Sequence, residues 1–144
     1  DPVTRLAACY ARDSGMGRNA PASSRFLGFQ KGMSFDAFAA WVCGIPDRKS
    51  PNAFRGQADI LLHKGRLLPD HLIRFESRQA DWTALRNKVK AKNGIDIGPL
   101  PEADTTSEPE IAAVAASLAP SLRKTVKQRY RRDYELLLRQ DAPR

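Results

Sequence analysis

The stretch LLPDHLIRFESRQADW, residues 67–82, decides the fold prediction. A turn-forming Pro-Asp pair precedes the apolar run at residues 72–75, which predicts a short, largely buried strand. The next residues predict a helix, because Ser77 is a suitable N-cap, Asp81 suits a first turn and Trp82 begins an apolar face. A strand that leads directly into an amphipathic helix indicates a chain with a sheet. We therefore predict an α/β fold, mostly helical, with a few short strands.

Two charged residues, Arg74 and Glu76, lie where this strand is expected to end. Open α/β sheets bind their ligands beyond the carboxyl ends of the strands, so the pair indicates a ligand crevice. The alternative is an ion pair that only fixes the end of the strand.

The composition is that of a basic globular chain. It has 144 residues, of which 42% are hydrophobic and 28% charged, enough for one domain with a core. We find no run long enough to span a membrane and no secretory signal. The start at Asp1 instead of Met indicates a mature product or a fragment with an upstream part. The net charge of +8 favours polyanionic partners such as nucleic acid, anionic sugars, nucleotide cofactors or an acidic membrane surface.

The cysteines and histidines do not predict a metal site. Cys9 and Cys43 lie far apart at apolar helical positions, so we interpret both as reduced core residues. His63 and His71 have neither helical i, i+4 spacing nor nearby cysteines, which makes a structural zinc ion improbable.

The N-terminus predicts a helix with a cationic edge. Asp1 is expected to cap it, and Pro2 suits the first helical position, where its missing N–H is not needed. Arg5, Ala8 and Arg12 line up on one stripe that starts where backbone N–H groups favour an anion. The alternative is a solvated basic face.

A long loop and an aromatic helix follow. Residues 14–32 are rich in Gly, Ser, Ala and Pro, and Arg18 and Arg25 help to make them basic, which predicts a functional or mobile loop. Ser34 is expected to cap the next helix. We interpret its aromatic stripe as core and not as a base-stacking surface, with these members: Phe35, Phe38, Trp41 and Val42.

The remaining patterns predict further helices. The apolar residues 60–62 fit either a strand or a short helix. Gly94 is expected to end the helix that contains Trp82, and residues 111–118 predict a short helix. Residues 122–138 predict a single amphipathic helix with basic residues outside its apolar face.

Several stretches follow one another in the order of the motifs of a known family. DPVTRLAACY, residues 1–10, resembles the motif R-[DN]-P-x-x-R-x-x-S-x-Y. SFDAF, residues 34–38, is similar to S-F-x-x-F, and Gln57 corresponds to the glutamine of a P-Q pair.

The later stretches continue the same order. IRFESRQADW, residues 73–82, is similar to G-R-F-E-x-L-x-x-D-[FW], and Leu100-Pro101 resembles the start of an L-P-x-x-N loop. YRRDYE, residues 130–135, resembles a terminal Y-x-x-D-[YF] helix. In this order the chain resembles the C-terminal half of the sulfotransferase superfamily that uses 3′-phosphoadenosine 5′-phosphosulfate. The closest likeness is to its carbohydrate and Golgi-type branch with bacterial relatives.

The resemblance implies that residues 1–144 are the C-terminal part of a P-loop-like sulfotransferase domain, without its N-terminal phosphosulfate-binding strand and loop. It implies transfer of a sulfuryl group from 3′-phosphoadenosine 5′-phosphosulfate to a hydroxyl of a carbohydrate, and a cytoplasmic location in a bacterium. Nucleic acid is not an expected partner. The implied cofactor-binding residues are Arg5, Ala8, Leu100, Pro101, Asp104 and Thr106. The implied acceptor-binding residues are Arg18, Arg25, Arg55 and Gln57.

The chain departs from the family pattern at positions that matter for phosphate binding. Ala8 stands where the family has the serine that shares the 3′-phosphate, and Asp104 stands where it has asparagine. The arginine that opens the phosphate motif would precede Asp1. The phosphosulfate loop and the catalytic base would also lie upstream, so we expect no catalytic residue and no sulfotransferase activity in this chain by itself. The resemblance requires no metal.

Two other hypotheses remain open. The basic surface also fits a helical module that binds polyanions or nucleic acid without catalysis. Ala8 and Asp104 fit a degenerate, noncatalytic relative of the family. Arg5 likewise has two roles open to it, either contacting a phosphate or bracing its helix against a neighbouring acid.

Overall fold

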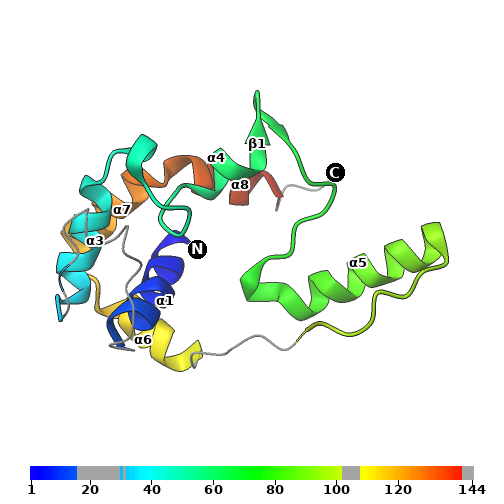
Figure 1. The fold of residues 1–144 in the computed structure, drawn as a ribbon, viewed down its shortest axis with the longest axis horizontal. Helices are drawn as coiled ribbons and strands as arrows, with labels where there is room; N and C mark the ends of the chain where they lie inside the picture. Colours follow the sequence, from blue (N-terminus) through cyan, green and yellow to red (C-terminus); the bar gives the residue numbers. More distant parts are fainter. Residues whose placement is uncertain (16–29, 31, 102–107, 141–144) are drawn as a thin grey trace. The chain divides into compact units, whose positions relative to one another are not determined.

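The computed structural model describes residues 1–15, 30, 32–101 and 108–140, and these form a mostly helical structure with one small sheet (Figure 1). The α-helices are α1 (Pro2–Gly15), α3 (Phe35–Gly44), α4 (Gln57–Leu61), α5 (Arg78–Asn93), α6 (Glu108–Ser117), α7 (Pro120–Arg129) and α8 (Arg131–Gln140). Two short 3-10 helices, η1 (Asp47–Lys49) and η2 (Phe75–Ser77), and two strands, β1 (Leu62–His63) and β2 (Arg66–Leu67), complete the list. The helical part of the fold prediction is confirmed.

By its internal contacts the chain forms two compact units. We call Asp1–Ile60 together with Thr105–Arg144 the core unit, and Leu61–Asp104 the hairpin unit. Within the described residues, no helix is both long and apolar enough to cross a lipid bilayer.

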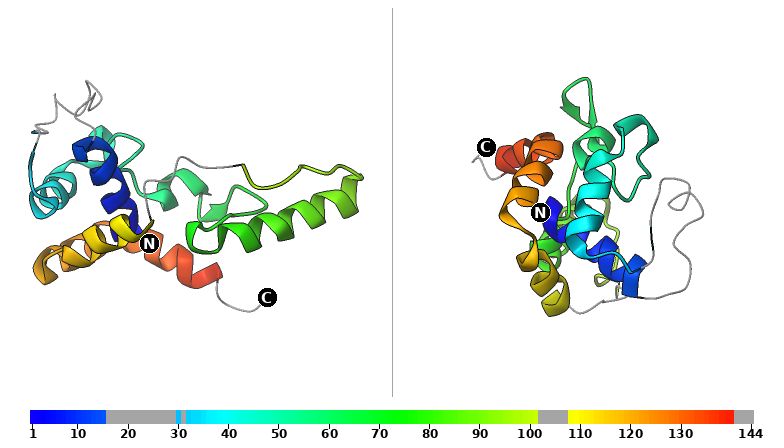
Figure 2. Two further views of the ribbon diagram at one scale, coloured as in Figure 1. Left: turned by 90° about the horizontal axis from the view of Figure 1, so that it is seen from below. Right: turned by 90° about the vertical axis from the view of Figure 1, so that its left-hand side faces the viewer.

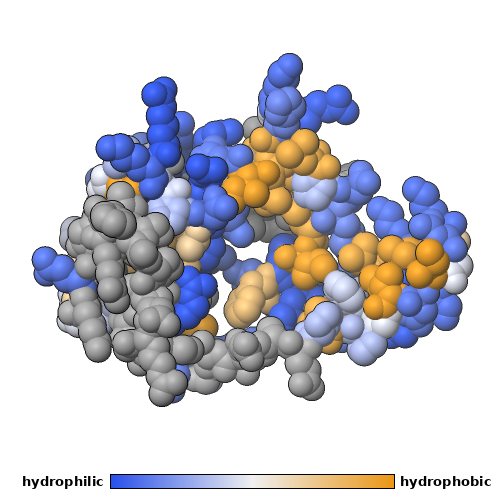
Figure 3. Space-filling view, in the orientation of Figure 1, coloured by the Kyte–Doolittle hydropathy of each residue, from blue (hydrophilic) through white to orange (hydrophobic). Residues whose placement is uncertain are grey.

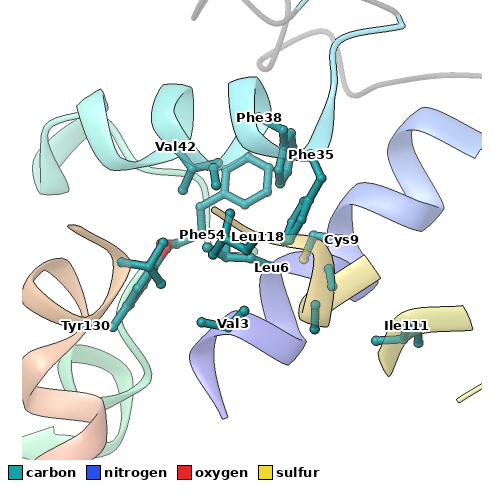
Figure 4. Packing of buried hydrophobic residues seen from close by; sticks show 14 of the residues in the cluster. Val3, Leu6, Cys9, Phe35, Phe38, Val42, Phe54, Ile111, Leu118 and Tyr130 are labelled. Carbon is teal, nitrogen blue, oxygen red and sulfur yellow. The ribbon is translucent and has the colours of Figure 1, made fainter. Parts of the chain in front are cut away.

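The core unit is built around α1. This helix packs against α3, α6 and α7, and α3 also packs against α7 (Figures 1 and 2). Figure 4 shows how the buried side chains of these helices and of the segment around Phe54 meet in one cluster. Its fully enclosed members include Leu6, Phe38, Val42 and Val126. Burying this much apolar and aromatic surface is the dominant stabilising term of the unit.

Two of the predicted N-terminal caps form, those of Asp1 and Ser34. The backbone N–H groups of Val3 and Thr4 donate to Asp1 Oδ1 at 2.8 and 3.1 Å, which satisfies donors that the first helical turn leaves free. Ser34 Oγ accepts from the Ala37 N–H at 3.2 Å at the start of α3. The predictions of a helix after Asp1 and of a helix after Ser34 are therefore confirmed.

The aromatic stripe of α3 lies in the core. Phe38 has no exposed surface, and its ring lies 5.4 Å from Tyr10, 5.7 Å from Trp41 and 5.6 Å from Phe54 between centroids. Tilted and edge-to-face pairs at these separations add to the stabilisation from burial. The prediction that this stripe is core, and not a base-stacking surface, is confirmed.

The prediction of one continuous C-terminal helix is wrong, because the chain turns at Tyr130 between α7 and α8. Tyr130 is 2% exposed, and its hydroxyl donates to the Phe54 carbonyl oxygen at 2.6 Å. The Arg129 guanidinium donates to the Ile45 carbonyl oxygen at 2.8 Å, at the C-terminal end of α3. These contacts to distant segments stabilise the break between α7 and α8. The helical periodicity of the sequence does not indicate them.

The hairpin unit contains the sheet. Strands β1 and β2 are antiparallel, with Leu62 opposite Leu67 and His63 opposite Arg66. The two residues between them, Lys64 and Gly65, have φ of 50° and 77°, as a type I′ turn requires. The alternatives left open for residues 60–62 are thereby resolved, since α4 ends at Leu61 and β1 begins at the next residue.

The strand predicted at residues 72–75 does not form. Arg74 does have extended backbone, with φ −83° and ψ 141°, but η2 begins at the next residue. A strand needs a partner for its backbone groups, and here the Arg74 N–H donates instead to the side chain of Asp81 at 2.9 Å. Ile73 and Phe75 are 39% and 52% exposed, so the predicted burial is wrong as well.

The helix predicted to contain Trp82 is α5, and it is confirmed. Gly94 ends it in the left-handed conformation, with φ 71°, and its N–H donates to the Lys90 carbonyl oxygen at 2.9 Å. Ser77 does not cap α5, because its hydroxyl donates to Asp81 at 2.9 Å instead. The segment after Gly94 runs back alongside the helix (Figures 1 and 2), where the Trp82 indole N–H donates to the Gly98 carbonyl oxygen at 3.0 Å.

Candidate functional site

Asp133, on the first turn of α8, is a buried carboxylate of the core unit that contacts two other helices. It is 3% exposed. Its Oδ2 accepts the Gln57 N–H and its Oδ1 accepts the Ala58 N–H, both at 2.9 Å. Arg5 Nη2 lies 3.6 Å from Oδ2. The carboxylate therefore binds the two N–H groups that open α4 and pairs with a cation from α1, an arrangement that compensates for its burial.

Three groups of the protein contact the guanidinium of Arg5. Its Nη2 donates to the Arg55 carbonyl oxygen at 2.9 Å and lies beside Asp133, while its guanidinium carbon lies 5.3 Å from the centroid of the Tyr130 ring. Its side chain is 21% exposed. This is the bracing arrangement that the sequence left open for Arg5, in which a neighbouring acid neutralises the cation.

The turn at residues 55–57 is shaped by the same contacts. A Cβ atom on Gly56 would lie 3.2 Å from Asp133 Oδ1 and 3.3 Å from Asp59 Oδ2, closer than most such contacts, which explains the glycine. Arg55 is half-buried, and among the described residues its guanidinium has neither a hydrogen bond nor an ion pair. The Gln57 side chain is exposed. We call Arg5, Arg55, Gln57 and Asp133 the Asp133 junction.

The junction brings together part of the predicted site. Of the residues assigned from the sequence to cofactor and acceptor binding, Arg5 contacts the backbone carbonyl of Arg55 and the carboxylate of Asp133, and Gln57 contacts Asp133 through its backbone N–H. Ala8 packs half-buried against the core cluster. Leu100 and Pro101 belong to the hairpin unit, where Leu100 is half-buried and Pro101 exposed. The other predicted site residues lie outside the described residues: Arg18, Arg25, Asp104 and Thr106.

Sequence reasoning missed the role of Asp133. The residue was recognised only as part of a terminal Y-x-x-D-[YF] pattern. Its partners lie on α1 and α4, far away in the chain, and no local periodicity relates them to it. The available signal was an acid three residues after Tyr130 and four before Leu137, on the apolar face of the predicted helix, since a buried carboxylate requires a partner.

A second polar cluster fixes the joint before α5. Arg74 Nε lies 3.2 Å from Asp81 Oδ2, and Ser77 and the Arg74 backbone also donate to this carboxylate. The side-chain hydrogen bond from Arg74, followed by the backbone and Ser77 bonds, lowers the pKa of Asp81 to about 2. The ion pair at this joint thus involves Asp81, and the ligand crevice expected at the end of a strand loses its basis because the strand is absent.

The thiols and imidazoles form no metal centre within the described residues, where no group of three possible ligands occurs. Cys9 is buried and Cys43 half-buried, and both are free thiols. Burial raises the pKa of the Cys43 thiol, opposed by the nearby charge of Arg129. His71 Nε2 lies 3.3 Å from the Asp81 carbonyl oxygen, in the hairpin unit.

The basic residues of α7 and α8 are largely engaged in holding the fold. Arg123 donates to the Ala115 carbonyl oxygen at 2.7 Å, at the C-terminal end of α6. Arg131 pairs with Glu135, and Arg132 pairs with Asp59. Among the described side chains of α7 and α8, Lys124 and Lys127 are exposed and have no salt bridge.

The junction joins α1, α4 and α8 through one buried carboxylate. Both oxygens of Asp133 already accept hydrogen bonds, so this carboxylate is poorly placed to serve as a general base. In comparisons with known proteins, no family model, no curated protein and no solved structure matches the chain.

Proposed function

We propose that this chain is the C-terminal part of a sulfotransferase, which transfers a sulfuryl group from 3′-phosphoadenosine 5′-phosphosulfate to a hydroxyl of a carbohydrate in the bacterial cytoplasm. The observation that carries the proposal is the meeting of three family-like stretches at one buried carboxylate. Arg5 comes from the stretch that resembles the phosphate motif, Gln57 from the P-Q position and Asp133 from the terminal helix. The order of the motifs along the chain and their contact in the fold together support the proposal.

The chemistry assigns different tasks to different parts of such an enzyme. In-line sulfuryl transfer requires groups that cradle the leaving 5′-phosphate, neutralise charge and deprotonate the acceptor. In the family these tasks fall to a loop and a base that precede the stretches present here. In the proposed enzyme, Arg5 of the junction would bind the 3′-phosphate end of the nucleotide. Arg55 and Gln57 would bind the acceptor.

The alternative of a noncatalytic module for polyanions or nucleic acid receives less support. Its natural surface is the basic face of α7 and α8, and there Arg123, Arg131 and Arg132 are bound to groups of the protein itself. Such a module would depend on the exposed lysines of α7, Lys124 and Lys127.

The proposal is tested by titrating adenosine 3′,5′-bisphosphate into the chain and following the backbone amides by NMR. We expect weak binding, with the largest shifts in the first turn of α1 and at residues 55–58. A charge-assisted contact contributes roughly 1.5–3 kcal/mol, so Arg5→Ala should lower the affinity of the folded protein about tenfold or more. Adenosine, which lacks both phosphates, should produce no comparable shifts.

Two variants separate phosphate binding from bracing. Asp133→Asn removes the anion beside Arg5 but keeps the cation, so the affinity of the folded fraction should be retained or increased. Lys124→Ala removes an exposed cation elsewhere in the same unit and should leave the affinity unchanged. Equal dissociation constants for the original chain and Arg5→Ala, with thermal unfolding recorded beside them, would remove Arg5 from the nucleotide site. Absence of any shift at the junction would contradict the proposal itself.

A further inference from the structure

The hairpin unit exposes apolar side chains to an extent that the core unit does not. None of its described residues, 61–101, is buried. Its large apolar side chains with substantial exposure are between 38% and 62% exposed: Leu67, Leu68, Ile73, Phe75 and Ile95. In Figure 3, hydrophobic residues gather on the visible face over the hairpin and over α5 with the segment that folds back on it. Exposed apolar surface of this kind marks an interaction site.

The same unit carries an excess of positive charge. Residues 61–101 contain eight Lys and Arg against four Asp and Glu, a net charge of +4. Two of these acids are compensated within the unit, because Asp81 pairs with Arg74 and Asp96 pairs with Arg86.

Several cations of the unit remain available. Lys88, Lys90 and Lys92 are exposed on the C-terminal half of α5, and none of them has a salt bridge to a described residue. Lys64 and Arg66 are exposed at the turn of the hairpin, next to the exposed Leu67. The cations therefore lie beside the apolar side chains along the chain and not in a separate region of it.

We propose that the hairpin unit docks on the surface of an anionic lipid bilayer. Clusters of Lys and Arg are attracted to anionic headgroups, and adjoining Leu, Ile and Phe side chains gain stability at the boundary of the acyl chains. The turn fits this role, because Lys64 and Arg66 can remain with the phosphates while Leu67 and Leu68 enter the interface.

The exposed aliphatic residues favour a lipid surface over other polyanions. Nucleic acids and anionic polysaccharides bind cations and stack on aromatic rings, but they do not bury aliphatic side chains such as Leu67, Leu68 and Ile95. A neutral bilayer, in turn, does not attract the lysines of α5 electrostatically. An anionic bilayer accommodates both sets of side chains. This inference does not depend on the proposed sulfotransferase function.

The test is co-sedimentation of the full chain with vesicles of phosphatidylcholine that contain about a third phosphatidylserine. We expect binding that weakens from about 0.1 M to about 0.5 M salt, because salt screens the attraction. Pure phosphatidylcholine vesicles should bind at least tenfold more weakly. Each lysine near an anionic surface is worth about fivefold in partitioning, so Lys88→Gln/Lys92→Gln should weaken binding roughly thirtyfold.

Matched variants decide between docking surfaces. Lys124→Gln/Lys127→Gln, which removes the same charge from α7 of the core unit, should change binding less than threefold. Leu67→Ser/Leu68→Ser should weaken vesicle binding about tenfold or more, and circular dichroism checks that both variants stay folded. The proposal is overturned if anionic vesicles do not bind or if the α7 variant loses as much as the α5 variant. It is equally overturned if the leucine variant binds vesicles as tightly as the original chain. That result would indicate a general polyanion-binding surface, and heparin should then bind the chain as tightly as the vesicles do.

Discussion

The two units of this chain are stabilised in different ways. The core unit encloses Leu6, Phe38 and Val126 completely, and its buried carboxylate, Asp133, is saturated with hydrogen bonds. The hairpin unit has no buried described residue. Apolar burial therefore dominates in the first unit, while surface ion pairs and a few hydrogen bonds organise the second. The comparison teaches that helices predicted equally well from sequence can differ widely in how much of their surface is buried.

The polar contacts of the hairpin unit show what replaces a core there. Arg86 Nε lies 2.5 Å from Asp96 Oδ1, and the Gly98 N–H donates to the same oxygen at 3.0 Å. With the Trp82 bond to Gly98, these contacts hold the segment after α5 against the helix. Exposed pairs of this kind contribute little each, so the unit should open without unfolding the core unit.

Phe38→Ala should cause the largest effect and sharpen the comparison most. Removing a fully buried ring in contact with Tyr10, Trp41 and Phe54 should lower the free energy of unfolding by about 3–5 kcal/mol. Trp82→Ala is the counterpart in the hairpin unit and should loosen α5 while leaving the main thermal transition in place. Calorimetry of both variants measures this, and a similar loss of melting temperature in each would break the distinction.

Asp133→Asn should have the next largest effect. The change weakens two hydrogen bonds at the start of α4 and leaves the partly buried Arg5 without its anion, so we expect a loss of about 2–3 kcal/mol. Asp59→Asn is the control, because it removes the partner of Arg132 in a largely exposed pair and should cost under about 1 kcal/mol. Urea unfolding compares them, and equal losses would show that the junction adds nothing beyond a surface pair.

Features that depend on contacts between residues close in the sequence were predictable, whereas features that depend on contacts between distant segments were not. Asp1, Ser34 and Gly94 act within their own helical turns, and their capping roles were predictable, as was the burial of the α3 stripe. The strand at residues 72–75 failed because extended backbone is a local property, whereas a strand needs a partner elsewhere.

The candidate site was predictable only in part. Motifs predicted Arg5 and Gln57, and Arg55 was expected as a cation for the acceptor; in the structure the backbones of Arg55 and Gln57 contact Arg5 and Asp133. The carboxylate that organises them, Asp133, and the break at Tyr130 depend on contacts with α1, α4 and the end of α3. No pattern within a helix encodes such partners.

The acid titration of Asp81 should show a smaller effect, confined to the hairpin unit. Its pKa of about 2 in the folded chain lies below the ordinary value of 3.8, so the contribution to stability is present above pH 3.8 and is lost as the pH falls toward 2. Arg74→Ala should return the pKa toward 3.8. Carboxyl-carbon NMR measures both midpoints, and an unchanged midpoint in the variant would show that Arg74 is not the cause.

The central claim, that burial and the Asp133 junction hold one unit while the other is held only at its surface, is tested most directly by native-state hydrogen exchange. The Gln57 and Ala58 amides, which donate to Asp133, should exchange as slowly as the amides of α3 and α7, at the rate set by global unfolding. The amides of α5 should exchange at least about a hundredfold faster through local opening. Equal protection in α5 and α7, or rapid exchange at Gln57 and Ala58, would contradict the account.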